Sequence, residues 1–319
     1  MIAITGSHGF VGKGFITFAS KKNIDVRLIA RENYLAVKSY EGCDVVIHLA
    51  GLAHRKSATL KDFIEINCDL AVNCARTAAR AGVKRFIYVS SSKALRDFAE
   101  NDQPLKESER ASPRCDYGRS KLAAETALLG LHREGHIEVV VIRPALVIGA
   151  PAKANLRTLA RAAHWACRLS PINGVANWVF SGFQAQKSYT SLENLCSALV
   201  CSAHSKLASG GVFHVVEDQT MSTAFLFNRM VAAGRTNLGL PRNTTSLNGS
   251  QTPTILTFVL RQVLTFLGMI QVFQALALPF VLDGTKIQKE LDWKPQAHID
   301  AELQRIMANL PSLDERSKG

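Results

Sequence analysis

The chain has 319 residues, of which 47% are hydrophobic and 20% are charged, a balance that supports one large buried core and excludes an intrinsically disordered protein. The formal net charge of +12 would suit an anionic partner, but the basic residues are scattered and match no nucleic-acid-binding pattern, so we expect no nucleic acid. The seven cysteines lack metal-ligand spacing and the first residues lack the pattern of a secretory leader, which together predict reduced thiols, no metal site and a cytoplasmic protein.

Apolar runs and helical periodicity alternate through the first half of the chain. The predicted strands cover residues 2–5, 26–29, 45–49, 85–89 and 138–142. The predicted helices cover residues 11–21, 61–81 and 117–133. Strands joined by helices in this order predict an α/β fold with a doubly wound parallel sheet, of the Rossmann type, over residues 1–150.

The second half of the chain is less regular. We expect residues 151–319 to form mainly a smaller substrate-binding part, with residues 186–205 returning to the first domain. Residues 262–282 carry no charge over 21 positions, which is long enough to cross a bilayer, but glutamines and Pro279 interrupt the run. We therefore expect residues 254–282 to form an apolar helical segment that is buried, contacts a partner, or makes a peripheral contact at the inner face of the membrane.

Two short patterns carry the chemistry. Gly6, Gly9 and Gly12 directly follow the first predicted strand, where glycines permit a sharp turn into a helix and a close approach of backbone N–H groups to a pyrophosphate. Tyr117 and Lys121 are four residues apart, so they share one face of a helix. We expect the ammonium to lower the pKa of the phenol from about 10 toward neutral pH, which would make Tyr117 an acid–base group.

Four motifs occur in a familiar order: TGSHGFVG at 5–12, DVVIHLAG at 44–51, YVSSSK at 88–93 and YGRSK at 117–121, with Ser92 lying 25 residues before Tyr117. Together they resemble the extended short-chain dehydrogenase/reductase family. The resemblance implies a catalytic set of Ser92, Tyr117 and Lys121 and an NAD or NADP cofactor. The cofactor-binding residues that it implies are Gly6, Gly9, Phe10, Val11, Gly12, Arg31, Leu49, Ala50, Gly51, Asn67, Ser90, Tyr117, Lys121 and Pro144.

The resemblance extends into the second half. Asn155 and Lys187 match positions that contact a nucleotide-diphosphate sugar in the family, and Ser92 would contact the sugar as well. The stretches SSSK, KANL and FHVVEDQTMST most resemble bacterial UDP-4-keto-6-deoxy-hexosamine 4-reductases of O-antigen and surface polysaccharide biosynthesis. The family also implies a homodimer.

Other branches of the family remain alternatives. Dehydratases commonly carry Asp-Glu after the active-site serine, where this chain has Lys93 and Ala94, and 4-epimerases carry Tyr-Gly where it has Arg96 and Asp97. A UDP-hexose 4-epimerase is the main alternative to a 4-ketoreductase. A non-catalytic protein that binds NAD(P)H and docks on a membrane or partner is a remote one.

The adenine side departs from the family pattern. Arg31 stands where NAD-preferring members carry an acidic residue, and a cation there accommodates a 2′-phosphate, which predicts that NADPH is accepted. The segment from 32 to 43 is short, so either the cofactor binds more weakly or a residue such as Tyr34 covers the adenine.

Overall fold

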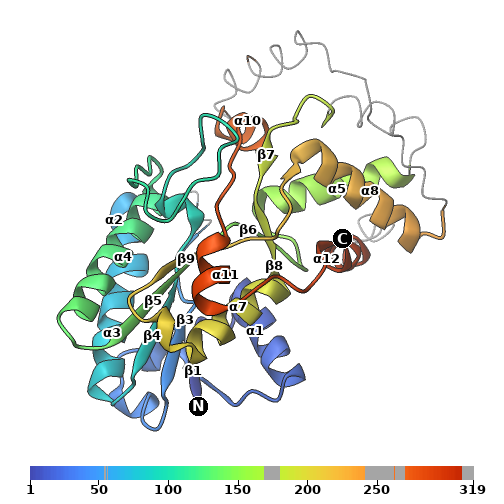
Figure 1. Ribbon diagram of the computed structural model, residues 1–319. Coiled ribbons are helices and arrows are strands. Elements are labelled where there is room, and N and C mark those ends of the chain that lie inside the picture. The colour runs from blue at the N-terminus through green and yellow to red at the C-terminus, as the bar shows by residue number, and fades with distance from the viewer. Residues whose placement is uncertain (54, 56, 169–179, 241–261, 263–269, 311–319) are drawn as a thin grey trace.

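The computed structural model describes the chain except for residues 54, 56, 169–179, 241–261, 263–269 and 311–319. Its centre is a sheet of six parallel strands in the order β2-β1-β3-β4-β5-β9 (Figure 1). The strands are β1 (Ile2–Thr5), β2 (Val26–Leu28), β3 (Val45–His48), β4 (Arg85–Val89), β5 (Glu138–Pro144) and β9 (Val212–Val215). This topology confirms the predicted doubly wound fold.

The strand order reverses at β1, because β2 pairs with one edge of this strand and β3 with the other. In open α/β sheets, ligands bind in the crevice beyond the carboxyl ends of the strands at such a switch point. Thr5 ends β1 and His48 ends β3. The backbone that begins at Gly6 and at Leu49 therefore borders the expected ligand crevice.

Helices cover both faces of the sheet, and each face has its own apolar cluster. On one face, α1 and α7 pack together, and Phe15 and Leu195 join Ile4 in the core. The other face is covered mainly by α3 and α4 (Figure 1). The covering elements are α1 (Phe10–Lys21), α2 (Leu60–Ile64), the π-helical turn η3 (Glu65–Asp69), α3 (Leu70–Arg80), α4 (Asp116–Arg133), α7 (Leu192–His204) and α11 (Thr285–Leu291).

A third group of helices lies on the opposite side of the sheet from α2, α3 and α4 (Figure 1). It consists of α5 (Ala154–Arg168), α8 (Thr223–Asn237) and α12 (Ile299–Ala308), which bury a separate apolar cluster. Two small ladders and one helix accompany it: β6 (Leu146–Ile148) with β8 (Tyr189–Ser191), β7 (Gln186–Lys187) with β10 (Met221–Ser222), and α10 (Ile270–Ala277). Short 3₁₀ turns complete the elements: η1 (Arg31–Asn33), η2 (Val37–Ser39), η4 (Ser92–Ala94) and η5 (Lys206–Ala208).

Two predicted elements differ from the structure. The single helix expected over 61–81 is divided into α2, η3 and α3, because a π-helical turn interrupts it. The strand expected to stop at residue 142 continues to Pro144, since Arg143 and Pro144 still pair with β9.

Within the described residues, no helix has the length and hydropathy of a membrane span, and most of segment 254–282 lies outside those residues.

Candidate active site

The glycine turn between β1 and α1 cannot accept larger residues. Gly6 has a φ of +75°, and a Cβ built on it would lie 2.5 Å from the backbone nitrogen of Ala50. A Cβ on Gly12 would lie 2.3 Å from the carbonyl oxygen of Gly6. The turn is therefore packed against both its own helix and the end of β3, as a close backbone approach requires.

The N-terminus of α1 is open to an anion. Gly9 is its N-cap, no side chain caps the helix and its first turn contains no acidic residue. The amides of Phe10 and Val11 thus belong to the helix end whose N–H groups lack intrahelical partners and attract negative charge. This end fits the pyrophosphate of a dinucleotide, and Gly6, Gly9 and Gly12 would line it.

Tyr34 supports the glycine turn from inside the protein. Its side chain is buried, and its hydroxyl accepts a 2.7 Å hydrogen bond from the amide of Gly6. Its ring packs in the core cluster on the α3 side of the sheet. The structure therefore gives Tyr34 a place beneath the turn and does not show it as a cover for adenine.

Lys121 lies beyond the ends of β3 and β4. Its ammonium donates a 2.9 Å hydrogen bond to the carbonyl of Val89 and lies 4.6 Å from the centre of the Tyr88 ring. A Cβ built on Gly51 would be 3.5 Å from the same nitrogen. The end of β3, the end of β4 and the middle of α4 thus meet at this ammonium.

The pKa values of this pair differ from the sequence-based expectation. Burial raises the pKa of Tyr117 to about 12 and lowers that of Lys121 to about 8. The ammonium is 6.0 Å from the centre of the Tyr117 ring and is hydrogen-bonded to Val89, so loss of water around the phenol outweighs its attraction. In this structure, Tyr117 is a protonated phenol at neutral pH.

Ser91 and Ser92 both lie in the turn after β4, and Ser91 is within reach of the Tyr117 phenol. A side-chain hydrogen bond with Ser91 is the main influence that lowers the pKa of Tyr117, against the larger effect of burial. Ser91 also caps η4 by accepting a bond from the amide of Lys93, whereas Ser92 is the first residue of η4 and is 5% exposed. The motif position predicts that Ser92 contacts the sugar, and this role stays a prediction.

Asn67 joins three parts of the site. Its amide exchanges hydrogen bonds with the backbone of Leu52, at 2.7 and 2.9 Å, and donates to the hydroxyl of Ser120 at 3.0 Å. A Cβ on Gly51 would meet its oxygen at 2.9 Å. The π-helical turn η3 therefore fastens the segment after β3 to α4, next to Lys121. Leu49 and Ala50 are half-buried in the same segment.

The remaining predicted cofactor residues occupy different surroundings. Arg31 is exposed at the start of η1, three residues beyond the end of β2. Ser90 is buried, and its hydroxyl donates to Glu125 inside the protein. Pro144 is buried at the end of β5, where it pairs with Val215.

The predicted substrate residues lie in the smaller part of the protein. Asn155 is in the first turn of α5. Lys187 is buried in β7, and its ammonium donates to the carbonyl of Leu276 at 2.9 Å and to the hydroxyl of Thr223 at 3.3 Å. Burial lowers the pKa of Lys187 to about 8. To bind a phosphate, this ammonium would have to exchange or share these contacts.

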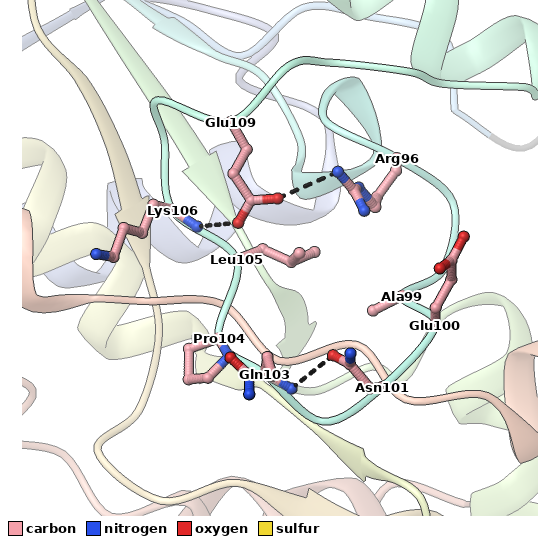
Figure 2. A pocket seen from close by; sticks show the side chains of 9 residues that line it. All are labelled: Arg96, Ala99, Glu100, Asn101, Gln103, Pro104, Leu105, Lys106 and Glu109. Carbon is pink, nitrogen blue, oxygen red and sulfur yellow. Dashed lines mark hydrogen bonds and ion pairs between the residues drawn. The ribbon is translucent and has the colours of Figure 1, made fainter.

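A polar pocket of about 370 Å³ lies in the loop between η4 and α4 and contains none of the predicted site residues (Figure 2). Figure 2 shows how the loop closes on itself, with Glu109 bound to both Arg96 and the amide of Lys106. Nearby, Asp97 accepts bonds from the amides of Arg114 and Cys115, just before α4 begins. Arg96 and Asp97, which replace the Tyr-Gly of epimerases, thus stabilise the approach to the Tyr117 helix.

Residues 2–214 match the profile of a known family, described as the NAD dependent epimerase/dehydratase family. The chain belongs to this family. It is therefore an enzyme of the extended short-chain dehydrogenase/reductase type, as predicted.

Relatives and solved structures agree with this assignment. A UDP-glucose 4-epimerase of Vibrio cholerae is 31% identical over 258 residues, which cover 73% of this chain and 75% of that protein. The solved structure of RMD from Pseudomonas aeruginosa, complexed with NADPH, is similar with a TM-score of 0.67, 21% identity and coverage of 96% and 97% of the two chains. A UDP-N-acetylglucosamine 4-epimerase from Bacillus cereus has the same fold, with a TM-score of 0.67 at 16% identity over 96% and 97%.

Proposed function

We propose that this protein is an NAD(P)-dependent oxidoreductase that reduces C4 of a UDP-4-keto-hexose in surface polysaccharide biosynthesis. The observation that carries the proposal is the position of Tyr117 one helical turn from Lys121, whose ammonium is held at the end of β4 and lies beside Gly51. Reduction of a ketone needs a proton donor next to the hydride acceptor. A protonated phenol is suited to that direction of the reaction.

Each residue of the site has a separate role in the proposed reduction. A bound nicotinamide cofactor would supply the hydride, which adds to the C4 carbonyl carbon. Tyr117 donates its proton to the carbonyl oxygen, Ser92 would hydrogen-bond that sugar oxygen, and Ser91 is within reach of the phenol. Lys121, held by Val89, places a positive charge beside the same group. Asn155 and Lys187 would contact the diphosphate, with Lys187 acting as a point charge.

A nucleotide-sugar 4-epimerase is the second candidate, and its support is the 31% identity with the enzyme of that name from Vibrio cholerae. Epimerisation first removes hydrogen from a secondary alcohol, a step for which Tyr117 must accept a proton. Arg96 and Asp97 stand where epimerases of the family commonly carry Tyr-Gly, which disfavours this candidate. The absence of an Asp-Glu pair after Ser92, where Lys93 and Ala94 stand, disfavours dehydration.

The deciding experiment incubates the protein with a UDP-4-keto-6-deoxy-hexosamine and NADPH and follows the absorbance of the reduced cofactor. Stoichiometric oxidation is expected, and Tyr117→Phe should reduce turnover on the order of 10²- to 10⁴-fold while cofactor binding persists. Interconversion of UDP-hexoses without net cofactor oxidation would instead assign an epimerase. Unchanged cellular function of Tyr117→Phe would favour the non-catalytic alternative.

We propose that Arg31 directs the enzyme toward NADPH. Arg31 is exposed three residues beyond the end of β2, the strand that pairs with β1. Arg31→Ala should weaken binding of NADPH more than that of NADH, whereas Lys38→Ala, an exposed cation in η2 of the same short segment, should not discriminate. A kcat/KM about tenfold higher with NADH than with NADPH in the wild type would contradict the proposal.

We also propose that the enzyme works in the cytoplasm as a homodimer. The proposal rests on the family resemblance, and light scattering after gel filtration tests the mass. Vesicle co-sedimentation tests whether segment 254–282 contacts a membrane.

A further inference from the structure

A buried ion pair lies one helical turn beyond Lys121. Glu125 and Arg143 are 2% and 5% exposed. The Arg143 guanidinium donates through Nη2 to Oε2 of Glu125 at 2.6 Å, and through Nε to both carboxylate oxygens at 2.9 and 3.2 Å. This contact fixes the carboxylate between α4 and β5. Removing two charges from water costs desolvation free energy, and this buried pair lies one helical turn from the catalytic lysine.

The pair reaches Lys121 through the end of β4. Oε1 of Glu125 also accepts a 2.5 Å hydrogen bond from the hydroxyl of Ser90. The preceding residue, Val89, provides the carbonyl that binds the Lys121 ammonium at 2.9 Å. The Val89–Ser90 peptide at the end of β4 is thus held at both residues. Lys121 binds the carbonyl of Val89, and Glu125 binds the hydroxyl of Ser90.

Glu125 also faces Lys121 electrostatically, and its negative charge raises the pKa of the ammonium against the larger effect of burial. Among the other groups around Lys121, the nearby tyrosines are neutral phenols whose pKa values burial raises. The titratable and charged groups that face this ammonium from the surrounding elements are His48 on β3, Tyr88 on β4, Tyr117 and Glu125 on α4, and Arg143 on β5 beyond Glu125.

We propose that Glu125 is a positioning residue for the catalytic pair: its carboxylate, oriented by Arg143, fixes the Val89–Ser90 peptide that holds Lys121 and supplies the negative charge that faces the ammonium. This inference rests on the proposed role of Tyr117 and Lys121 in catalysis. A role confined to joining α4 to β5 would be the structural alternative, and it predicts a loss of stability without a change in the titration of Lys121.

The test is Glu125→Gln, which keeps the size of the side chain and an oxygen for Ser90 but removes the charge. The control is Glu138→Gln, because Glu138 pairs with Arg85 at the opposite end of β5, away from Lys121, although its side chain is more exposed than that of Glu125. The first measurement is the pH dependence of Lys121 acetylation by acetic anhydride, read by mass spectrometry with the exposed Lys84 as internal standard. This readout does not require turnover or a bound cofactor.

We expect Glu125→Gln to lower the midpoint of Lys121 labelling by about one pH unit, and Glu138→Gln to leave it at the wild-type value. With the keto-sugar and NADPH, kcat of Glu125→Gln should fall on the order of 10- to 100-fold, because the ammonium is misplaced, and the basic limb of its pH profile should move to lower pH. A wild-type labelling midpoint in Glu125→Gln would overturn the proposal, whatever its stability.

If Glu125→Gln does not fold, Glu125→Asp is the variant to test. It keeps the negative charge, but its side chain is one methylene shorter, so the carboxylate lies farther from the Ser90 hydroxyl. Glu125→Asp should retain the wild-type midpoint of Lys121 labelling but have a lower kcat. A wild-type kcat in this variant would overturn the positioning role. If the wild type turns over no keto-sugar, the proposed reductase function fails, while the labelling experiment still decides the contribution of Glu125.

Discussion

Gly6 shows how one residue can determine whether a site forms. Its positive φ already disfavours a side chain, and the space where a Cβ would lie is occupied by the backbone of Leu49 and Ala50. Its amide is hydrogen-bonded to Tyr34, so the turn cannot move away without breaking that contact. Conformation and close packing therefore act together at this position.

Gly42 offers a matched comparison, because its φ is also +75° but a Cβ would meet nothing within 4 Å. Gly42→Ala should cost about 1–2 kcal/mol of unfolding free energy, the penalty for the left-handed conformation alone. Gly6→Ala should cost more than Gly42→Ala in urea unfolding, and should also abolish NADPH binding measured by fluorescence. Equal losses of stability and intact binding in both variants would contradict the assigned role of the turn.

At the scale of elements, α7 shows how the second half of the chain is joined to the first. Its apolar face packs on the sheet beside α1. Its C-terminal end is held by Arg85 of β4, whose Nη1 donates to the carbonyls of Ser202, Ala203 and Ser205. A guanidinium at this end also complements the partial negative charge of the helix terminus.

Arg85→Ala should lower the free energy of unfolding on the order of 3 kcal/mol, because three carbonyls, two of them buried, and Glu138 lose a charged donor together. Urea unfolding measures this change. The neighbouring Lys84 pairs with Asp44 at the surface, and Lys84→Ala should change stability little. Similar effects of the two substitutions would mean that α7 does not depend on Arg85.

At the scale of the whole molecule, buried histidines link stability to pH. His48 is fully buried, hydrogen-bonded to Thr5 at 2.9 Å and stacked against Tyr88. Burial lowers the pKa of His48 to about 3, and burial likewise lowers that of His214 to about 4. As pH falls below about 6.5, an unfolded chain binds these protons before the folded protein does, so stability is lost with falling pH.

His48→Asn should therefore weaken the dependence of stability on pH. Between about pH 5 and 7, the slope of unfolding free energy against pH should be smaller than in the wild type by up to one proton, about 1.4 kcal/mol per pH unit. Urea unfolding at several pH values provides the slopes, and the comparison cancels the groups common to both proteins. His136→Asn, at an exposed histidine, serves as the control, and a wild-type slope in His48→Asn would contradict the prediction.

Regular elements were predictable because their signals are local. The glycine spacing, the apolar strands and the Tyr117–Lys121 interval are all read within a few residues, and the family assignment followed from their order. The π-helical turn that carries Asn67 has no comparable local signal. Its helix-forming residues predict an unbroken helix, and only the hydrogen bonds of Asn67 with Leu52 and Ser120 show why the turn is there.

The amino-acid sequence by itself determined the fold class, the family and the residue types of the site, since periodicity, turn chemistry and spacing are properties of the chain. The tertiary structure alone decided in which direction burial shifts the pKa values of Tyr117 and Lys121, that a π-helical turn carries Asn67, and that Ser90 binds Glu125. These outcomes depend on solvent exclusion and on side-chain direction where separate strands and helices meet, which no local pattern encodes.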